Sequence, residues 1–148
     1  MLLETPVSSL EIRADAAGVR SASLWLEQQG SARAIPSGQI FRLDLCLNEA
    51  LANTIEHGGQ QAVLAPVRLG LELGVSDGSA CATLMISDAG LAFNPLSATP
   101  KLRPDSLAQA SPGGLGLGLM RSFADEVSYA HSQGRNCLRF VVRWSADQ

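Results

Sequence analysis

Three short segments of the sequence carry polar or glycine residues in patterns that can do chemistry. The segment NEALANTIEHG places Glu49 and Asn53 four residues apart, so that both side chains share one face of a helix. The segment ISDAG ends an apolar run on Asp88 and follows it with Gly90. The segment SPGGLGLGLM, residues 111–120, puts four glycines into ten residues just before another helical pattern.

Each pattern also has a structural explanation. Polar residues on one face of an amphipathic helix are usually solvated. An aspartate followed by glycine at a strand end is most often a turn, although it also presents one fixed carboxylate to a pocket wall beside closely approaching backbone. The glycines could form a hinge or a close helix-packing surface. At a loop-to-helix junction they could instead expose backbone N–H groups as an anion site.

Two well-known nucleotide motifs are missing from the sequence. The glycines at 114, 116 and 118 do not match G-x-G-x-x-G, and they follow a proline-rich segment rather than a strand. No G-x-x-x-x-G-K-[ST] segment occurs. A nucleotide site here therefore has to belong to another class.

The elements that position these segments can be predicted from periodicity and turn signals. The first half predicts a strand at Val7–Ala14, a helix from an Asp15 N-cap to Gly30, and a second helix from about Pro36 to the Gly58-Gly59 pair. The inward positions expected for these helices are Val19, Ala22, Trp25 and Leu26, and then Ile40, Leu43, Leu47, Ala50, Leu51 and Thr54.

The second half predicts strands at Val67–Val75 and Ser79–Asp88, joined by a turn at Ser76-Asp77-Gly78. A long loop with four prolines, Asn94–Pro112, leads to a helix at Gly114–Ala124. Two final strands, Asp125–Ser132 and Asn136–Trp144, flank a turn at Gly134. This order predicts an α+β fold, a two-layer sandwich of a mixed, mostly antiparallel sheet with helices on one face.

Composition narrows the class of protein. The chain has 148 residues, 46% of them hydrophobic, and a net charge of −3, which suits one domain and argues against nucleic acid as the main partner. No apolar run approaches the length of a membrane span, and the N-terminus lacks the pattern of a signal peptide. The cysteines Cys46, Cys81 and Cys137 are scattered within apolar sequence, so we expect buried thiols in a reducing cytoplasm.

Order and spacing together are more specific than any single segment. An E-x-x-x-N helix, a strand-end D-x-G, a long loop, a G-x-G-x-G before a helix and a closing hairpin resemble the GHKL ATP-binding fold of gyrase, Hsp90, histidine kinases and MutL. Within that fold the chain resembles the stand-alone anti-sigma-factor serine/threonine kinases of the RsbW and SpoIIAB type. The resemblance covers nearly the whole chain and implies a single kinase domain over residues 1–148, with an ATP lid at about 91–113.

The resemblance implies a role for individual residues. Glu49 is the expected general base on the attacking hydroxyl, and Asn53 is the expected ligand of Mg²⁺ on the phosphates of ATP. Asp88 is expected to accept a hydrogen bond from the adenine amino group, with Gly90 letting the backbone lie close to the base. The expected phosphate loop consists of Gly114, Leu115, Gly116, Leu117 and Gly118.

The sequence departs from the family pattern at two places. The usual D-x-G-x-G is D-A-G-L-A here, with Ala92 at the second glycine. A threonine on the last hairpin that helps bind adenine is replaced by Asn136 or Cys137. The roles of Lys101 and Arg103 in the lid and of Arg121 after the glycines, whether toward phosphate, partner or solvent, stay open.

Two functions follow as hypotheses. The first is an ATP-dependent protein serine/threonine kinase that phosphorylates a STAS-domain anti-sigma-factor antagonist and switches between it and a sigma factor or another regulator. A PP2C-type phosphatase in the same pathway and a homodimer are further expectations. The second is a binding module that senses nucleotide, or ignores it, and regulates by sequestration alone. A self-contained ATPase clamp fits less well, because the chain lacks the second domain that such clamps use.

Overall fold

The fold is built on one five-stranded sheet, and the computed structural model describes residues 7–96 and 120–145 of the chain. The strand order is β1-β2-β3-β5-β4, and all four neighbouring pairs are antiparallel. The strands are β1 (Ser8–Ile12), β2 (Val67–Ser76), β3 (Ser79–Asp88), β4 (Glu126–Ser132) and β5 (Arg135–Ser145).

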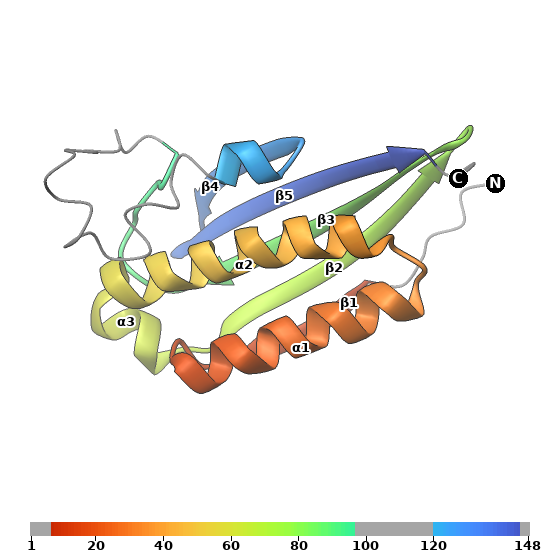
Figure 1. Ribbon diagram of the computed structural model, residues 1–148. Helices are drawn as coiled ribbons and strands as arrows, with labels where there is room; N and C mark the ends of the chain where they lie inside the picture. The colour runs from red at the N-terminus through yellow and green to blue at the C-terminus, as the bar shows by residue number, and fades with distance from the viewer. Residues whose placement is uncertain (1–6, 97–119, 146–148) are drawn as a thin grey trace, which may run out of the picture.

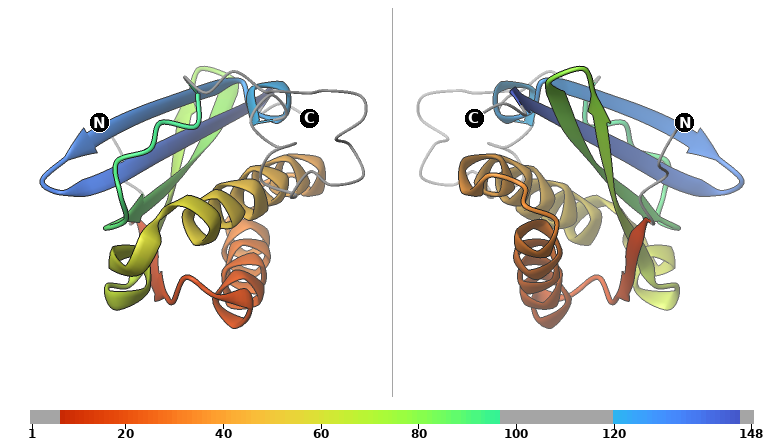
Figure 2. Two further views of the ribbon diagram at one scale, coloured as in Figure 1. Left: turned by 90° about the vertical axis from the view of Figure 1, so that its left-hand side faces the viewer. Right: turned by 90° about the vertical axis from the view of Figure 1, so that its right-hand side faces the viewer.

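Two long helices cover one face of this sheet (Figures 1 and 2). Helix α1 (Ala16–Ala32) begins at Asp15, whose side chain accepts a hydrogen bond from the Gly18 amide. Helix α2 (Ser37–His57) follows Pro36, which takes the N-cap position. The short helix α3 (Gly59–Leu64) continues directly from the end of α2. The predicted two-layer α+β architecture is confirmed, although every strand pairing in the described residues is antiparallel rather than mixed.

Alternation along the strands places the core between the two layers. On β3 and β5 the positions that face the helices include Leu84, Ile86, Leu138 and Phe140, all buried. They pack against the apolar face of α2, where Leu43, Leu47 and Leu51 are almost completely inaccessible. This packing fixes α2 across the sheet, so residues at its C-terminal end lie beside the end of β3.

Most predicted boundaries agree with the structure to within about two residues. The hairpin turns are confirmed at Asp77-Gly78 and at Gln133-Gly134, where both residues of each pair have positive φ. Helix α3 was missed, because the Gly58-Gly59 pair indicated the end of helical structure. Of the predicted helix at Gly114–Ala124, only residues 120–124 lie within the described chain, and residues 120–123 are helical.

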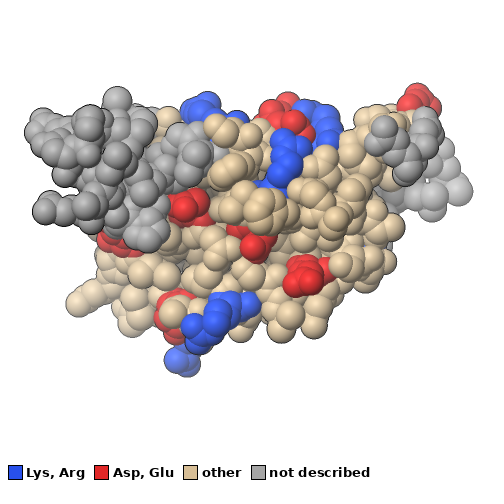
Figure 3. Space-filling model, in the orientation of Figure 1, with Lys and Arg blue, Asp and Glu red and all other residues tan. Residues whose placement is uncertain are grey.

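The surface carries no dominant basic patch in the view of Figure 3, where blue and red atoms are scattered over the described residues. No helix within residues 7–96 and 120–145 is long and apolar enough to cross a membrane. Cys46 is fully buried, and burial raises the pKa of its thiol to about 12. Cys81 and Cys137 are only half-buried, so the prediction of buried thiols holds for one of the three.

Candidate functional site

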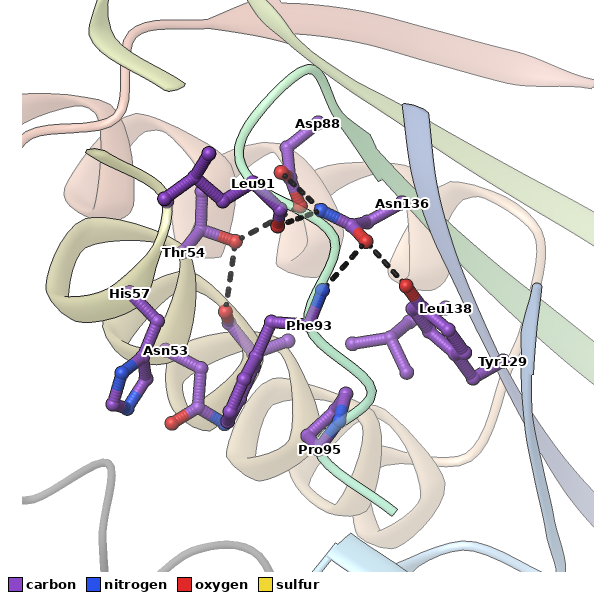
Figure 4. A pocket seen from close by; sticks show the side chains of 12 residues that line it. Asn53, Thr54, His57, Asp88, Leu91, Phe93, Pro95, Tyr129, Asn136 and Leu138 are labelled. Atoms are coloured by element: carbon purple, nitrogen blue, oxygen red, sulfur yellow. Dashed lines mark hydrogen bonds between the residues drawn. The ribbon is translucent and has the colours of Figure 1, made fainter. Parts of the chain in front are cut away.

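A small cavity lies where the C-terminal half of α2 meets the ends of β3 and β5 (Figure 4). Helix α2 contributes one face to it, with side chains spaced at three or four residues. Its lining residues are Ala50, Asn53, Thr54, His57, Gly58, Asp88, Leu91, Phe93, Pro95, Tyr129, Asn136 and Leu138. The predicted Asn53 and Asp88 therefore meet in one place, although they are 35 residues apart in the sequence.

Asp88 is held at the cavity by three donors. Its Oδ1 accepts from the Gly90 amide at 2.9 Å and from Asn136 Nδ2 at 3.1 Å, while its Oδ2 accepts from the Thr54 hydroxyl at 3.2 Å. Asp88 is only 7% exposed. An ionised carboxylate oxygen accepts about two hydrogen bonds. Oδ1 is therefore fully used, and Oδ2 keeps acceptor capacity for a donor inside the cavity.

Asn53 differs from an ordinary solvated helix residue. It is 4% exposed, and neither its Oδ1 nor its Nδ2 has a hydrogen-bond partner among the described residues. Buried side-chain amides without partners are rare because each lost hydrogen bond costs about 1–3 kcal/mol. Asn53 therefore lines the cavity with both polar atoms available for a ligand.

Glu49 lies one helical turn before Asn53 and does not line the cavity itself. Its Oε2 is buried without a partner in the described part of the chain, and burial raises the pKa of its carboxyl group above the usual value. A raised pKa brings a carboxylate closer to the range in which a general base works well. The position and environment of Glu49 are compatible with the predicted proton acceptor at the edge of the site.

Gly90 packs against the backbone of Gly58, the C-cap residue of helix α2. A Cβ atom at this position would come within 2.8 Å of Gly58 Cα and 3.0 Å of Gly58 O. The requirement for glycine is therefore one of space, because backbone meets backbone here.

Residues that follow β3 lie over the cavity. The Leu91 amide donates to Gly58 O at 3.0 Å, and the Phe93 ring stacks on His57 with ring centroids 4.4 Å apart. Figure 4 shows the side chains of His57, Asn53 and Phe93 next to one another. The remaining cavity volume is about 20 Å³. A single water molecule needs about 10–15 Å³ by the same measure, so this space is too small for a purine.

Arg42 links α2 to the chain beyond the predicted glycine loop. Its Nε donates to Phe123 O at 2.6 Å, and its guanidinium contacts Asp125 at 3.2 Å. The carboxylate of Asp125 also accepts from the Arg143 amide at 2.7 Å. These contacts fix where the helical residues 120–123 sit relative to α2.

The structure thus brings Asn53, Asp88 and Gly90 together, with Glu49 one turn away. The predicted phosphate-loop residues, Gly114, Leu115, Gly116, Leu117 and Gly118, lie outside the described residues, as do Lys101 and Arg103. Arg121 donates to Leu96 O at 3.3 Å, and this bond connects the two described ranges of the chain, 7–96 and 120–145.

Sequence reasoning did not single out several residues of the site. The helical spacing predicts Thr54 as a core residue, no pattern indicates Phe93 or Tyr129, and Asn136 stands out only as a departure from the family pattern. The sequence contains two signals for these residues. Thr54 is polar and directly follows Asn53, and Asn136 is polar and lies on the last hairpin. The partners that make them functional come from distant parts of the chain.

The residues fit a magnesium nucleotide chemically. An amide oxygen such as Asn53 Oδ1 is a hard ligand of the kind that Mg²⁺ accepts, and Asp88 Oδ2 can accept from an exocyclic amine. Both groups are buried, which strengthens their interaction with a ligand.

Comparisons with known proteins agree with this arrangement. The family model described as the histidine kinase-like ATPase domain matches residues 12–142. The serine/threonine-protein kinase BtrW of Bordetella bronchiseptica is 32% identical over 136 residues, which cover 92% of this chain and 93% of BtrW.

Two solved structures share the fold. The RsbU and RsbW domains of a Mycobacterium tuberculosis protein superpose with a TM-score of 0.61 at 15% identity over 93% of this chain. This chain spans 32% of that longer one. The SiaB-SiaC complex of Pseudomonas aeruginosa gives a TM-score of 0.54 at 12% identity, covering 91% of this chain and 88% of the matched chain.

The family match covers most of the chain, including α2, Asp88 and the closing hairpin. The sequence, fold and site geometry agree with it. The chain belongs to the histidine kinase-like (GHKL) ATPase domain family, and its sequence is similar to that of a serine/threonine-protein kinase within it.

Proposed function

We propose that this protein is an ATP-dependent protein serine/threonine kinase of the anti-sigma type. Its substrate is a STAS-domain anti-sigma-factor antagonist, and it alternates between that antagonist and a sigma factor or another regulator. The similarity to BtrW, a serine/threonine-protein kinase, supports the reaction class. The structural likeness to the RsbU–RsbW and SiaB-SiaC structures supports the fold.

One observation carries the proposal: Asn53 is buried at the cavity with both side-chain polar atoms free of partners among the described residues. A purely structural asparagine would be hydrogen-bonded or solvated. A Mg²⁺ ion, when bound, supplies charge that offsets repulsion on the phosphates of ATP.

Other residues of the protein bind the adenine base, accept the proton and bind the phosphates in this proposal. Asp88 Oδ2 accepts from the adenine amino group and distinguishes adenine from guanine, whose corresponding position is a carbonyl. Glu49 takes the proton from the attacking serine or threonine hydroxyl of the substrate, since burial makes its carboxylate more basic. The glycines at 114, 116 and 118 provide backbone N–H groups to the phosphates in this proposal.

Regulation by sequestration without phosphoryl transfer is the second candidate. Two observations favour it. The cavity measures only about 20 Å³, and Ala92 stands at the second glycine of the D-x-G-x-G pattern. Calorimetry with Mg-ATP, Mg-ADP and Mg-GTP separates the kinase from sequestration that does not depend on nucleotide. The kinase proposal expects ATP and ADP to bind and GTP to bind much more weakly. No binding of any nucleotide at millimolar concentration would favour sequestration.

A further inference from the structure

Asn136 on β5 is the most highly connected side chain of the site. Its Nδ2 donates to Leu91 O at 2.8 Å, to Asp88 Oδ1 at 3.1 Å and to Gly90 O at 3.3 Å. Its Oδ1 accepts from the Phe93 amide at 3.2 Å and from the Tyr129 hydroxyl. Figure 4 shows this amide at the centre of the hydrogen-bond network.

These contacts define the orientation of the amide. Nδ2 faces only acceptors, and Oδ1 faces only donors, so a flipped amide would place like groups against each other. Burial raises the pKa of the Tyr129 hydroxyl, although a contact with the Phe93 backbone opposes this, and the hydroxyl remains a donor at neutral pH.

Protein atoms use all the hydrogen-bonding capacity of Asn136. A primary amide has two N–H donors and an oxygen with two lone pairs. Asn136 therefore has no polar group left for a base in this conformation. Its hydrogen bonds hold the chain after Asp88 against β5.

The chain that Asn136 holds is the same chain that closes the cavity. Leu91, Phe93 and Pro95 line it on one side, and the cavity keeps only about 20 Å³. A purine can enter only if these residues move outward. That movement breaks the bonds from Asn136 to Leu91 O and from the Phe93 amide to Asn136.

We propose that Asn136 is a latch, a positioning residue that holds residues 91–93 over the base pocket and so sets the affinity for adenine nucleotide. The proposal rests on the proposed function in one respect, the identity of the ligand. The protein binds nucleotide with the latch open, and the free energy needed to open it weakens the observed affinity.

Asn136→Ala is the variant that tests the latch. An alanine side chain has no polar atom, so it makes neither the bond to Leu91 O nor the bond from the Phe93 amide. Asn48→Ala is the matched control, because Asn48 is half-buried and bonds to Ser23 and Asp44 on the helices, away from the cavity. Both variants are compared with wild type in the absence of nucleotide.

Amide hydrogen exchange at Leu91 is the first readout. The Leu91 amide bonds to Gly58 O and not to Asn136, so its exchange reports movement of the whole segment. The latch predicts at least about tenfold faster exchange at Leu91 in Asn136→Ala and no such change in Asn48→Ala. Faster exchange at Phe93 alone, with Leu91 unchanged, would overturn the latch.

Nucleotide affinity is the second readout. Asn136→Ala should lower the Kd for Mg-ADP by about tenfold, because the variant no longer has to open the latch before binding and gains no hydroxyl that could bind the base. Tyr129→Phe, which removes one donor to Asn136, should change the Kd in the same direction by a smaller factor. Weaker binding by Asn136→Ala would overturn the latch and make Asn136 a support for the bound base.

The two readouts separate the latch from the proposed function. If neither wild type nor Asn136→Ala binds nucleotide, the proposed function fails and the latch has no role in affinity. The exchange rate at Leu91 still decides whether Asn136 holds the segment closed.

Discussion

The Thr54 hydroxyl on α2 donates to Asp88 Oδ2 at the end of β3, over a distance of 3.2 Å. This bond ties the helix that carries Glu49 and Asn53 to the strand that ends in Asp88, whose carboxylate lines the cavity. The same hydroxyl lies 3.1 Å from Ala50 O, so its single proton is shared between two acceptors. The relative position of helix and strand at the site therefore depends in part on one side chain.

Thr54→Val should lower the free energy of unfolding by about 1–2 kcal/mol, because Asp88 Oδ2 loses the only donor that the described residues give it. Thr54→Ser keeps the hydroxyl and should lose less than half as much. Urea unfolding of the two variants checks this. Equal stability of Thr54→Val and wild type would show that the bond contributes nothing.

Gly90→Ala should abolish nucleotide binding, because its Cβ would press against the Gly58 backbone and against Asp88 Oδ1 and so displace the carboxylate proposed to bind adenine. Gly38→Ala is the matched control. A Cβ atom there meets nothing within 4 Å, and alanine favours a helix by up to about 1 kcal/mol. Calorimetry and thermal unfolding of both variants provide the measurement. Normal nucleotide binding by Gly90→Ala would contradict the close approach of the two chains.

Glu49→Gln should stop phosphoryl transfer and slightly stabilise the fold at neutral pH. Burial raises the pKa of Glu49 in the folded state, so its stabilising contribution is present below about pH 4.5 and is lost as the pH rises through the folded pKa. The gain at neutral pH should stay below about 1 kcal/mol, because partial exposure screens the charge.

Urea midpoints across this pH range test the Glu49 prediction, with Glu27→Gln on the exposed surface of α1 as the control. The difference between Glu49→Gln and wild type should grow with pH above 4.5, whereas the control should follow wild type. A constant difference at all pH values would contradict the burial argument.

Asp125→Asn should make the free energy of unfolding fall less steeply as the pH is lowered. Burial tends to raise the pKa of Asp125, but hydrogen bonds from the Arg143 amide and the Arg42 side chain outweigh it and lower the pKa. The stabilisation is therefore complete above about pH 4 and disappears as the pH falls through the lower folded pKa.

Unfolding midpoints between about pH 2 and pH 6 measure this effect. Glu126→Gln is the control, since Glu126 forms an exposed ion pair with the same Arg143. If Asp125→Asn loses stability in acid as steeply as wild type, the contacts of Asp125 with Arg42 and Arg143 do not stabilise the fold.

The sequence predicted the framework because its signals are local. Asp77-Gly78 and the Gly134 turn specify two hairpins by backbone conformation, and the apolar spacing of Leu43, Leu47 and Leu51 specifies the buried face of α2. The Gly58-Gly59 pair does end α2, with Gly59 at positive φ, but the six-residue helix α3 that follows is too short to show a helical period in the sequence.

The environment of the site residues could not be predicted in the same way. Asn53 lies on a polar helix face, and such faces are usually solvated. It is buried because Phe93 and His57 stack beside it and because the chain after β3 folds back over α2. The role of Asn136 likewise depends on the meeting of β5 with residues 88–93, which no local pattern encodes.

Transfer of the γ-phosphate of ATP to a STAS-domain antagonist tests the central claim most directly. The antagonist is incubated with Mg-ATP and either wild type, Glu49→Gln or the matched Glu27→Gln, and its phosphorylation is followed by mass. The account predicts stoichiometric phosphorylation by wild type and Glu27→Gln, and a rate lower by at least about 10²-fold for Glu49→Gln. Wild-type protein that binds Mg-ATP and the antagonist but transfers no phosphate, or a Glu49→Gln variant as fast as wild type, would contradict it.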